Sequence, residues 1–289
     1  MNETDFPALY GAADSASNEA QSFLLSSYKI STIFLVMAVA TSLEGPSHRY
    51  LAIGSAICFI GSLLAFIYSK HQKFRENWYQ ARALAESIKT ATWRLVMSAE
   101  PFQQANEELN LENFRELLTE LLEENKGIGT HLSGDWAQKD EITTRMNEIL
   151  HMPFEEKKAI YLKERIDDQR SWYANKSGKN RNASTKFFWL TIAAYGIAIV
   201  FLMVRIAQPD ISFLPIDVLA IIASGFIGWT EIRRFDELAS AYGLTAHEVG
   251  IIKSRYKSVT SIEHFSNFVS DAENAFSREH TQWAARRDH

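Results

Sequence analysis

A set of aromatic, basic and acidic side chains at helical spacing is the first candidate for chemistry in this chain. Tryptophan rings beside guanidinium groups suit stacking on a nucleotide base and contact with its phosphates. The same residues could instead hold the helices together, and their spacing lets Arg82 pair directly with Glu86 one helical turn later. The structural interpretation is favoured, and ligand binding is kept as the alternative. The set consists of Trp78, Arg82, Glu86, Lys89, Trp93 and Arg94.

No pattern typical of an enzyme accompanies these residues. Phosphate-binding loops, dinucleotide fingerprints, zinc-protease motifs and nucleophile elbows are all missing from the sequence. The adjacent pairs His247-Glu248 and Glu279-His280 diverge on a helix, so they do not converge on a metal. The single cysteine, Cys58, excludes an intrachain disulfide and a thiolate cluster. We therefore expect no enzymatic activity, no metal and no cofactor.

The overall charge argues against one further class of partner. The formal net charge is -5, whereas phosphate backbones are bound by basic faces. We expect no nucleic acid polymer as a partner.

Four apolar runs must position these side chains. The run 50–68 has no charge and no proline, and at ~1.5 Å per residue it makes a helix of roughly 28 Å, close to the hydrocarbon thickness of a bilayer. A basic cluster begins just after it, at Lys70. The runs 23–43, 187–204 and 211–229 have the same character, with Lys29 placed to snorkel to the headgroups.

Short turns join these runs in pairs. The turn 44–49 joins the first two spans and 205–210 joins the last two, so we expect two antiparallel hairpins and four spans. Lys and Arg gather at the outer ends of the hairpins, which places both termini and the middle region in the cytosol. The expected fold class is an all-α membrane protein with helical cytosolic regions between and after its two hairpins.

Four regions follow from this organisation. Residues 1–22 look like a short mobile cytosolic tail, and 23–102 comprise the first hairpin with its following helix. Residues 103–160 form a helical middle region, in which we expect helices at 110–126 and 135–151 and a third starting near Phe154 and ending near Tyr173. Residues 161–289 hold the second hairpin and two terminal helices, broken near Ser258, the last capped by a Thr260–Glu263 box.

Small and hydroxyl residues on the spans are candidates for helix interfaces or a pore lining. Small residues at four-residue spacing favour close helix packing. Packing within one protomer is favoured over packing between protomers. Span hydroxyls can also bond to their own helix backbone. Asp217 is expected in the first turn of its helix after Pro215, and a charge ring at a pore mouth is the alternative. The candidates are Ser55, Ser62, Asp217, Ser224 and Gly228.

The two halves of the chain look like a parallel repeat of two spans followed by a helix. In this comparison Glu86 and Glu248 lie in register. The segment 78–89, followed by Trp93, Arg94 and the Pro101-Phe102 pair, resembles the SLATT family. These are two-transmembrane effector domains found with bacterial nucleotide-second-messenger systems. The second half resembles another branch of that family through Tyr161, Arg165, Asp168, Gln169, Trp172, Tyr173, Glu273, Glu279, His280 and Trp283.

The resemblance implies a membrane effector of anti-phage defence that oligomerises and breaches the bacterial inner membrane. Its expected partners are the lipid bilayer, further copies of the chain, and a cytosolic signalling protein or a nucleotide second messenger. The alternative is a non-conducting anchor or scaffold that recruits a cytosolic defence enzyme.

Overall fold

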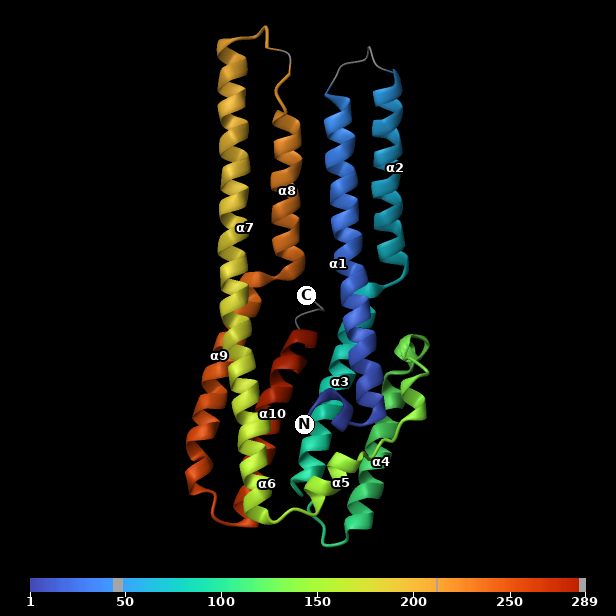
Figure 1. Cartoon of the computed structure of the whole chain (residues 1–289), viewed down its shortest axis with the longest axis vertical. Helices are drawn as coiled ribbons and strands as arrows, with labels where there is room; N and C mark the ends of the chain where they lie inside the picture. The colour runs from blue at the N-terminus through green and yellow to red at the C-terminus, as the bar shows by residue number, and fades with distance from the viewer. Residues whose placement is uncertain (44–48, 212, 286–289) are drawn as a thin grey trace. The chain divides into compact units, whose positions relative to one another are not determined.

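The computed structural model describes residues 1–43, 49–211 and 213–285, with only the backbone described for 278–285. The described residues form helices and turns without a strand, so the all-α class predicted from the sequence is confirmed. The helices, labelled in Figure 1, are α1 (Ala8–Ser42), α2 (Arg49–His71), α3 (Phe74–Val96), α4 (Glu107–Glu124), α5 (Thr144–Leu150), α6 (Phe154–Ile160), α7 (Asp168–Ala207), α8 (Ile216–Arg233), α9 (Phe235–Ser254) and α10 (Ile262–Ala285).

Three stretches of helix are long and apolar enough to cross a bilayer. They begin at Ala8, Arg49 and Phe154, and their most apolar windows have mean hydropathies of 1.8, 2.2 and 2.3. Helix α8 is not among them because its 18 residues include Asp217, Glu231 and Arg233. The membrane character of the chain is thus established, whereas the expected count of four spans stays a prediction.

The chain divides into two compact units, each built from separate segments. We call Ser22–Phe74 with Ser177–Ser240 the membrane unit, because these segments contain the apolar runs. The other, here called the extramembrane unit, comprises Met1–Gln21, Arg75–Lys176 and the chain from Ala241 onward.

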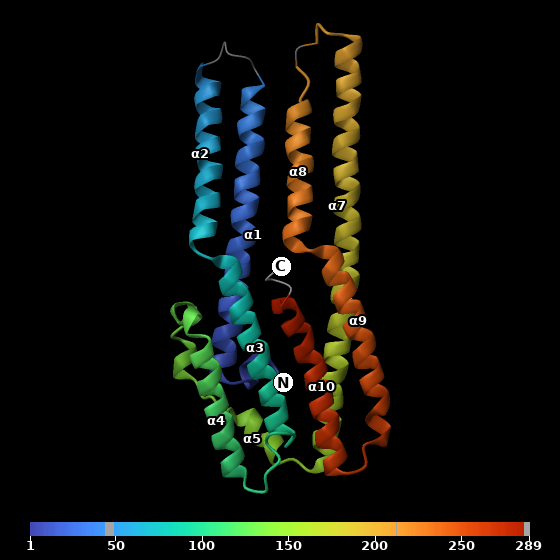
Figure 2. The ribbon, with the colours of Figure 1, turned by 180° about the vertical axis from the view of Figure 1, so that it is seen from behind.

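In the membrane unit, helices pair as antiparallel neighbours: α1 with α2, and α7 with α8 (Figure 1). Both views also place α1 beside α8 (Figure 2). In the extramembrane unit, α10 lies beside α3, and the core there is built from large aromatic and aliphatic side chains. Its fully buried members include Trp93, Tyr161, Phe102, Phe114, Phe265 and Phe276.

The beginning of the chain differs from the expected mobile tail. Residues from Ala8 onward already belong to α1, and Phe6, Tyr10 and Ala13 are buried in the core of the extramembrane unit. These apolar residues recur every three to four positions, which lays one face of α1 against the core. The segment is therefore part of the folded unit.

Three helix boundaries also differ from the predicted ones. The expected helix 135–151 is a 3₁₀ turn followed by α5, because the Thr143 hydroxyl accepts the Met146 N–H at 3.2 Å and starts a new helix. The helix expected to end near Tyr173 runs on in α7 to Ala207, since no proline interrupts the basic stretch between them. Helix α10 is capped by Ser261, which accepts the His264 N–H at 3.2 Å, so the predicted Thr260–Glu263 box is wrong.

Candidate functional site

A buried ion pair lies at the centre of the extramembrane unit. Arg165 donates from Nε to Glu273 Oε1 at 2.9 Å and from Nη2 to Glu273 Oε2 at 2.6 Å. The side chains are 1% and 0% exposed. The Tyr161 hydroxyl donates to Glu273 Oε1 at 2.9 Å, and the guanidinium stacks on Phe276 at 4.5 Å. This bidentate geometry is the strongest form of Arg–carboxylate contact, and it joins the segment just before α7 to α10.

The local backbone explains how two residues reach one carboxylate. A π-helical segment, Tyr161–Asp167, connects α6 to α7. Tyr161 and Arg165 lie one turn apart on it, so both side chains project from the same face toward Glu273. Burial keeps water from competing for the carboxylate, and burial also raises the pKa of the Tyr161 phenol.

A second charged group lies on α3 and includes the pair predicted from its spacing. Arg82 contacts Glu86 Oε1 at 2.5 Å, which confirms the predicted pairing, and it donates to Asp14 Oδ1 at 3.1 Å. Lys89 lies one turn further along, with its Nζ 5.9 Å from the Phe6 ring centre. Burial lowers the pKa of the Lys89 ammonium, and the Glu86 carboxylate partly offsets this. Arg82 therefore links Glu86 on its own helix to Asp14 on α1, the kind of contact that the structural interpretation expects.

Two of the remaining motif residues of α3 contact other parts of the chain, and the third contacts its own helix. Trp93 is buried and packs edge-on against Tyr161, with ring centres 5.7 Å apart. Arg94 donates from Nη2 to Asn274 Oδ1 on α10 at 2.8 Å. Trp78 stacks on its neighbour Tyr79, with ring centres 4.8 Å apart. Trp93 and Arg94 thus hold α3 against the chain's second half.

The second-half motif residues include buried, partly buried, exposed and undescribed members. Asp168 is exposed, and it accepts a bond from the largely buried Gln169 at 3.4 Å. Trp172 packs edge-on against Tyr242, with ring centres 5.4 Å apart, and Lys176 Nζ lies 5.3 Å from the same indole. The side chains of Glu279, His280 and Trp283 lie outside the described residues.

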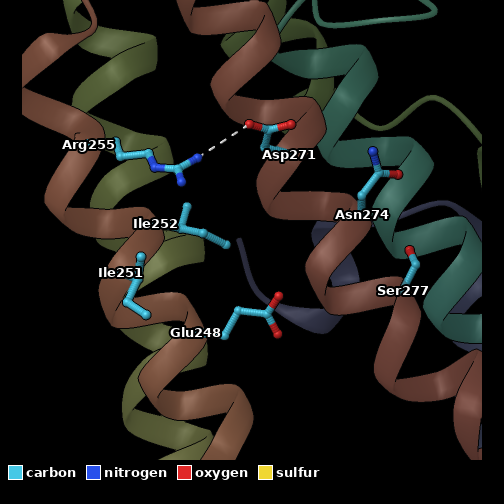
Figure 3. Close-up of a pocket in the computed structure, with 7 residues that line it drawn as sticks. All are labelled: Glu248, Ile251, Ile252, Arg255, Asp271, Asn274 and Ser277. Carbon is cyan, nitrogen blue, oxygen red and sulfur yellow. Dashed lines mark ion pairs between the residues drawn. The ribbon is translucent and has the colours of Figure 1, made fainter.

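An open groove of about 820 Å³ lies between α9 and α10 (Figure 3). Glu248 and Asp271 contribute two carboxylates, and Arg255, which contacts Asp271 at 3.9 Å, contributes the one guanidinium of its described lining. The charge balance of this groove disfavours an anionic nucleotide. In the described part of the chain, no three His, Cys, Asp or Glu side chains gather to hold a metal ion. The groove is lined by Glu248, Ile251, Ile252, Arg255, Asp271, Asn274 and Ser277.

In the membrane unit, two of the candidate pore residues lie in the seam between α1 and α2. The Ser55 hydroxyl donates to the Ala38 carbonyl at 2.8 Å, and the Ser62 and Ser31 hydroxyls are 2.9 Å apart. Both Ser55 and Ser62 are buried within the hairpin. Their polar groups are therefore used inside one chain.

Gly228, another candidate, lies where α8 meets α1. The Tyr28 hydroxyl donates to the Gly225 carbonyl at 3.0 Å, and a Cβ on Gly228 would lie 2.2 Å from that same hydroxyl. Gly228 thus lets Tyr28 of the first hairpin contact the backbone of the second. Ser224 is exposed and donates to its own helix at Ala220, and Asp217 is exposed in the first turn of α8, as predicted.

Comparison with protein families gives two adjacent matches. Residues 7–158 match SMODS and SLOG-associating 2TM effector domain 3, and residues 161–283 match SMODS and SLOG-associating 2TM effector domain 1. The chain belongs to the SLATT family. It carries two tandem SLATT domains, as the resemblance implies. Neither the curated proteins nor the solved structures give a match.

The two SLATT domains do not coincide with the two compact units. Each domain supplies one hairpin to the membrane unit and further helices to the extramembrane unit. Within the extramembrane unit the domains contact one another through Trp93 with Tyr161, Arg94 with Asn274, and Lys158, whose Nζ donates to the Val259 carbonyl at 2.6 Å. The tandem domains therefore share a single core.

The structure also reveals a junction that is repeated in both SLATT domains. Lys73 follows α2 with a φ of 50°, and Arg234 follows α8 with a φ of 49°. In each case the next residue is a buried phenylalanine, which stacks on a phenylalanine of the other helix of its hairpin. Phe74 stacks on Phe23 at 5.4 Å, and Phe235 stacks on Phe187 at 5.7 Å.

This repeated junction changes the register assumed from the sequence. Counted from Lys73 and Arg234, Glu86 corresponds to His247, one residue before Glu248. The expected Glu86–Glu248 equivalence is therefore wrong by one position. The left-handed backbone, rare for residues other than glycine, gives a more specific alignment than the scattered acidic residues do.

Sequence reasoning missed several residues of the buried charged groups. Asp14 was assigned to a mobile tail, although Phe6, Tyr10 and Ala13 around it follow a helical period that was a usable signal. Tyr161 was noted as part of the resemblance and given no separate role. Its pairing with Glu273 joins residues 112 positions apart, which no local pattern reveals.

Proposed function

We propose that this SLATT protein is a membrane effector of a nucleotide-signal-linked anti-phage system that oligomerises and forms or gates a pore in the bacterial inner membrane. The effector role follows from both of its domains. In this proposal the extramembrane unit lies in the cytosol, where it receives a signal from a signalling protein or a nucleotide second messenger.

The buried ion pair supports the topology on which this proposal depends. Arg165 precedes the second hairpin and Glu273 follows it, yet their side chains bond directly. Both residues must therefore lie on the same side of a bilayer. Since α7 crosses, α8 must return, so the proposal has four spans despite the charges at the ends of α8.

The apolar surface of the membrane unit is the observation that supports an oligomeric pore. Its helices expose large apolar side chains, including Ile57, Ile60 and Leu64 on α2 and Ile199 and Met203 on α7. The described hydroxyls of Ser31, Ser55 and Ser62 bond within the chain. A single copy therefore offers no continuous polar path, and ion passage requires several copies or a rearrangement of the hairpins.

Membrane potential and assembly test the proposal together. Induction of the full chain together with a protein that generates its signal should depolarise bacteria, and crosslinking should give homo-oligomers that grow on activation. A loss-of-function variant for comparison is Ala223→Arg. It places a charge at a residue of α8 that is 0% exposed and should abolish depolarisation. An unchanged potential despite insertion and a triggered signal would argue against a pore.

The acidic face of α4 favours a second candidate, a non-conducting scaffold for a cytosolic defence enzyme. Seven glutamates and one arginine lie on this helix, and all are exposed. Such a surface suits a basic partner protein. A fixed one-to-one crosslinked complex with an unchanged membrane potential is the result that supports the scaffold. The glutamates are Glu107, Glu108, Glu112, Glu116, Glu120, Glu123 and Glu124.

A further inference from the structure

Two cationic side chains from different hairpins lie against one indole of the membrane unit. Lys29 Nζ on α1 is 5.1 Å from the Trp229 ring centre, and Arg233 Cζ on α8 is 6.0 Å from it. The Arg233 guanidinium also lies 5.5 Å from the Phe235 ring. Lys29 belongs to the first SLATT domain and Arg233 to the second, so two positive charges meet at the seam between the domains.

Among the described residues, Lys29 and Arg233 have no carboxylate partner, unlike Arg234, which follows Arg233 in the chain. Arg234 contacts Glu237 at 2.5 Å. In the portion of the chain that the structure describes, neither Lys29 nor Arg233 forms an ion pair, and Lys29 is exposed. Like charges on one ring repel, so an anion bound between them is stabilised by both.

The position of the group points to the headgroup level of a bilayer. Lys29 is followed by the uncharged run Ile30–Leu43, and Trp229 ends the apolar run of α8. Trp and Tyr side chains concentrate at membrane–water interfaces, and here Trp229 packs on Tyr28 with ring centres 6.0 Å apart. Basic residues at that level attract anionic lipids.

We propose that Lys29 and Arg233, beside Trp229, bind the phosphodiester headgroup of an anionic phospholipid. The bound lipid bridges α1 and α8, which already touch through Tyr28 and Gly225. Anionic lipid therefore strengthens the seam between the two SLATT domains. This inference rests on the placement of the membrane unit in a bilayer and is independent of pore formation.

The test uses the purified full chain in nanodiscs of phosphatidylcholine, with and without phosphatidylglycerol. Phosphatidylglycerol should raise the midpoint of thermal unfolding, and the double variant Lys29→Gln/Arg233→Gln should lose most of that rise. Two lost cation contacts should weaken phosphatidylglycerol binding about thirtyfold, as measured by lipid titration. The charge-preserving variant Lys29→Arg/Arg233→Lys should keep the effect.

Two further arms separate this site from other sources of the same chemistry. Arg205→Gln removes an exposed cation beyond the other end of the α7 apolar run and should leave the lipid effect unchanged. If Arg205→Gln and the double variant lose the same part of the midpoint rise, the lipid effect comes from general surface charge, and the proposed site is contradicted. Inorganic phosphate added to phosphatidylcholine nanodiscs should have no effect, and an equal rise of the midpoint would assign the site to free phosphate instead.

If the double variant unfolds at a lower temperature even in pure phosphatidylcholine, lipid titration of the folded protein below that temperature still decides the question. Unchanged phosphatidylglycerol binding there contradicts the proposal.

Discussion

The contacts inside the extramembrane unit differ in kind from the contacts inside the membrane unit. The extramembrane unit buries an ion pair, Arg165 with Glu273, inside a core of large aromatic side chains. The membrane unit packs through small residues and through single hydroxyl bonds such as Ser55 to the Ala38 carbonyl. Separating a buried charge from its partner strongly destabilises the fold, whereas each hydroxyl hydrogen bond in a membrane contributes little to stability.

This difference indicates which part of the molecule can rearrange. The extramembrane unit specifies one arrangement of the two SLATT domains, because their helices share one core. The contacts between hairpins in the membrane unit are individually weak, so exchanging them would cost little for each contact. The proposed function, a response to a signal followed by a change in the membrane, would need both properties.

Breaking the buried pair should have the largest effect. Glu273→Ala leaves Arg165 charged and buried, and we expect it to destabilise the protein by about 3–5 kcal/mol. The measurement is denaturant unfolding of the solubilised full chain, followed by tryptophan fluorescence. The control is Asp271→Ala, on the same helix as Glu273. It removes the exposed ion-pair partner of Arg255 and should cost less than about 1 kcal/mol. Equal losses in the two variants would contradict the central role of the buried pair.

Crowding the seam between the hairpins should have an intermediate effect. Gly228→Leu forces α8 away from Tyr28 on α1, and overpacking of this kind costs about 1–3 kcal/mol. The thermal midpoint of the chain in nanodiscs measures it. Gly196→Leu is the control, because a Cβ there meets no atom within 4 Å. If both leucines lower the midpoint equally, the α1–α8 seam is not a packing contact.

Removing one hydroxyl should have the smallest effect. Ser31→Ala loses the contact with Ser62, which we expect to cost about 0.6 kcal/mol because unfolded segments in a membrane also find hydrogen-bond partners. Ser224→Ala serves as the comparison, since its hydroxyl bonds to its own helix, and it should be neutral within error. Unfolding in nanodiscs resolves the pair of variants; a loss above that of Gly228→Leu would reverse the proposed order.

The sequence predicted features that depend on local pattern. The helical spacing of Trp78, Arg82 and Glu86 marked α3, and the uncharged run 50–68 marked α2. It did not predict the left-handed residues Lys73 and Arg234, because only glycine would have signalled such a backbone.

Long-range pairing was also beyond sequence reasoning. Arg165 and Glu273 are 108 residues apart, and many other Arg and Glu residues were equally eligible as partners. The α1 start was missed for a different reason. Phe6, Tyr10 and Ala13 follow a helical period, but the segment around them is rich in alanine and serine, so the local signal was present and weak.

The topology of the chain tests the central claim most directly: both SLATT domains build one extramembrane unit on one side of the membrane. Reporters active on only one side can be fused after Lys139, after Gln208 and at the C-terminus of the full chain. The account predicts the first and last reporters on the same side and the reporter after Gln208 on the opposite side. A C-terminal reporter on the side opposite to Lys139 would separate Glu273 from Arg165 and contradict the account.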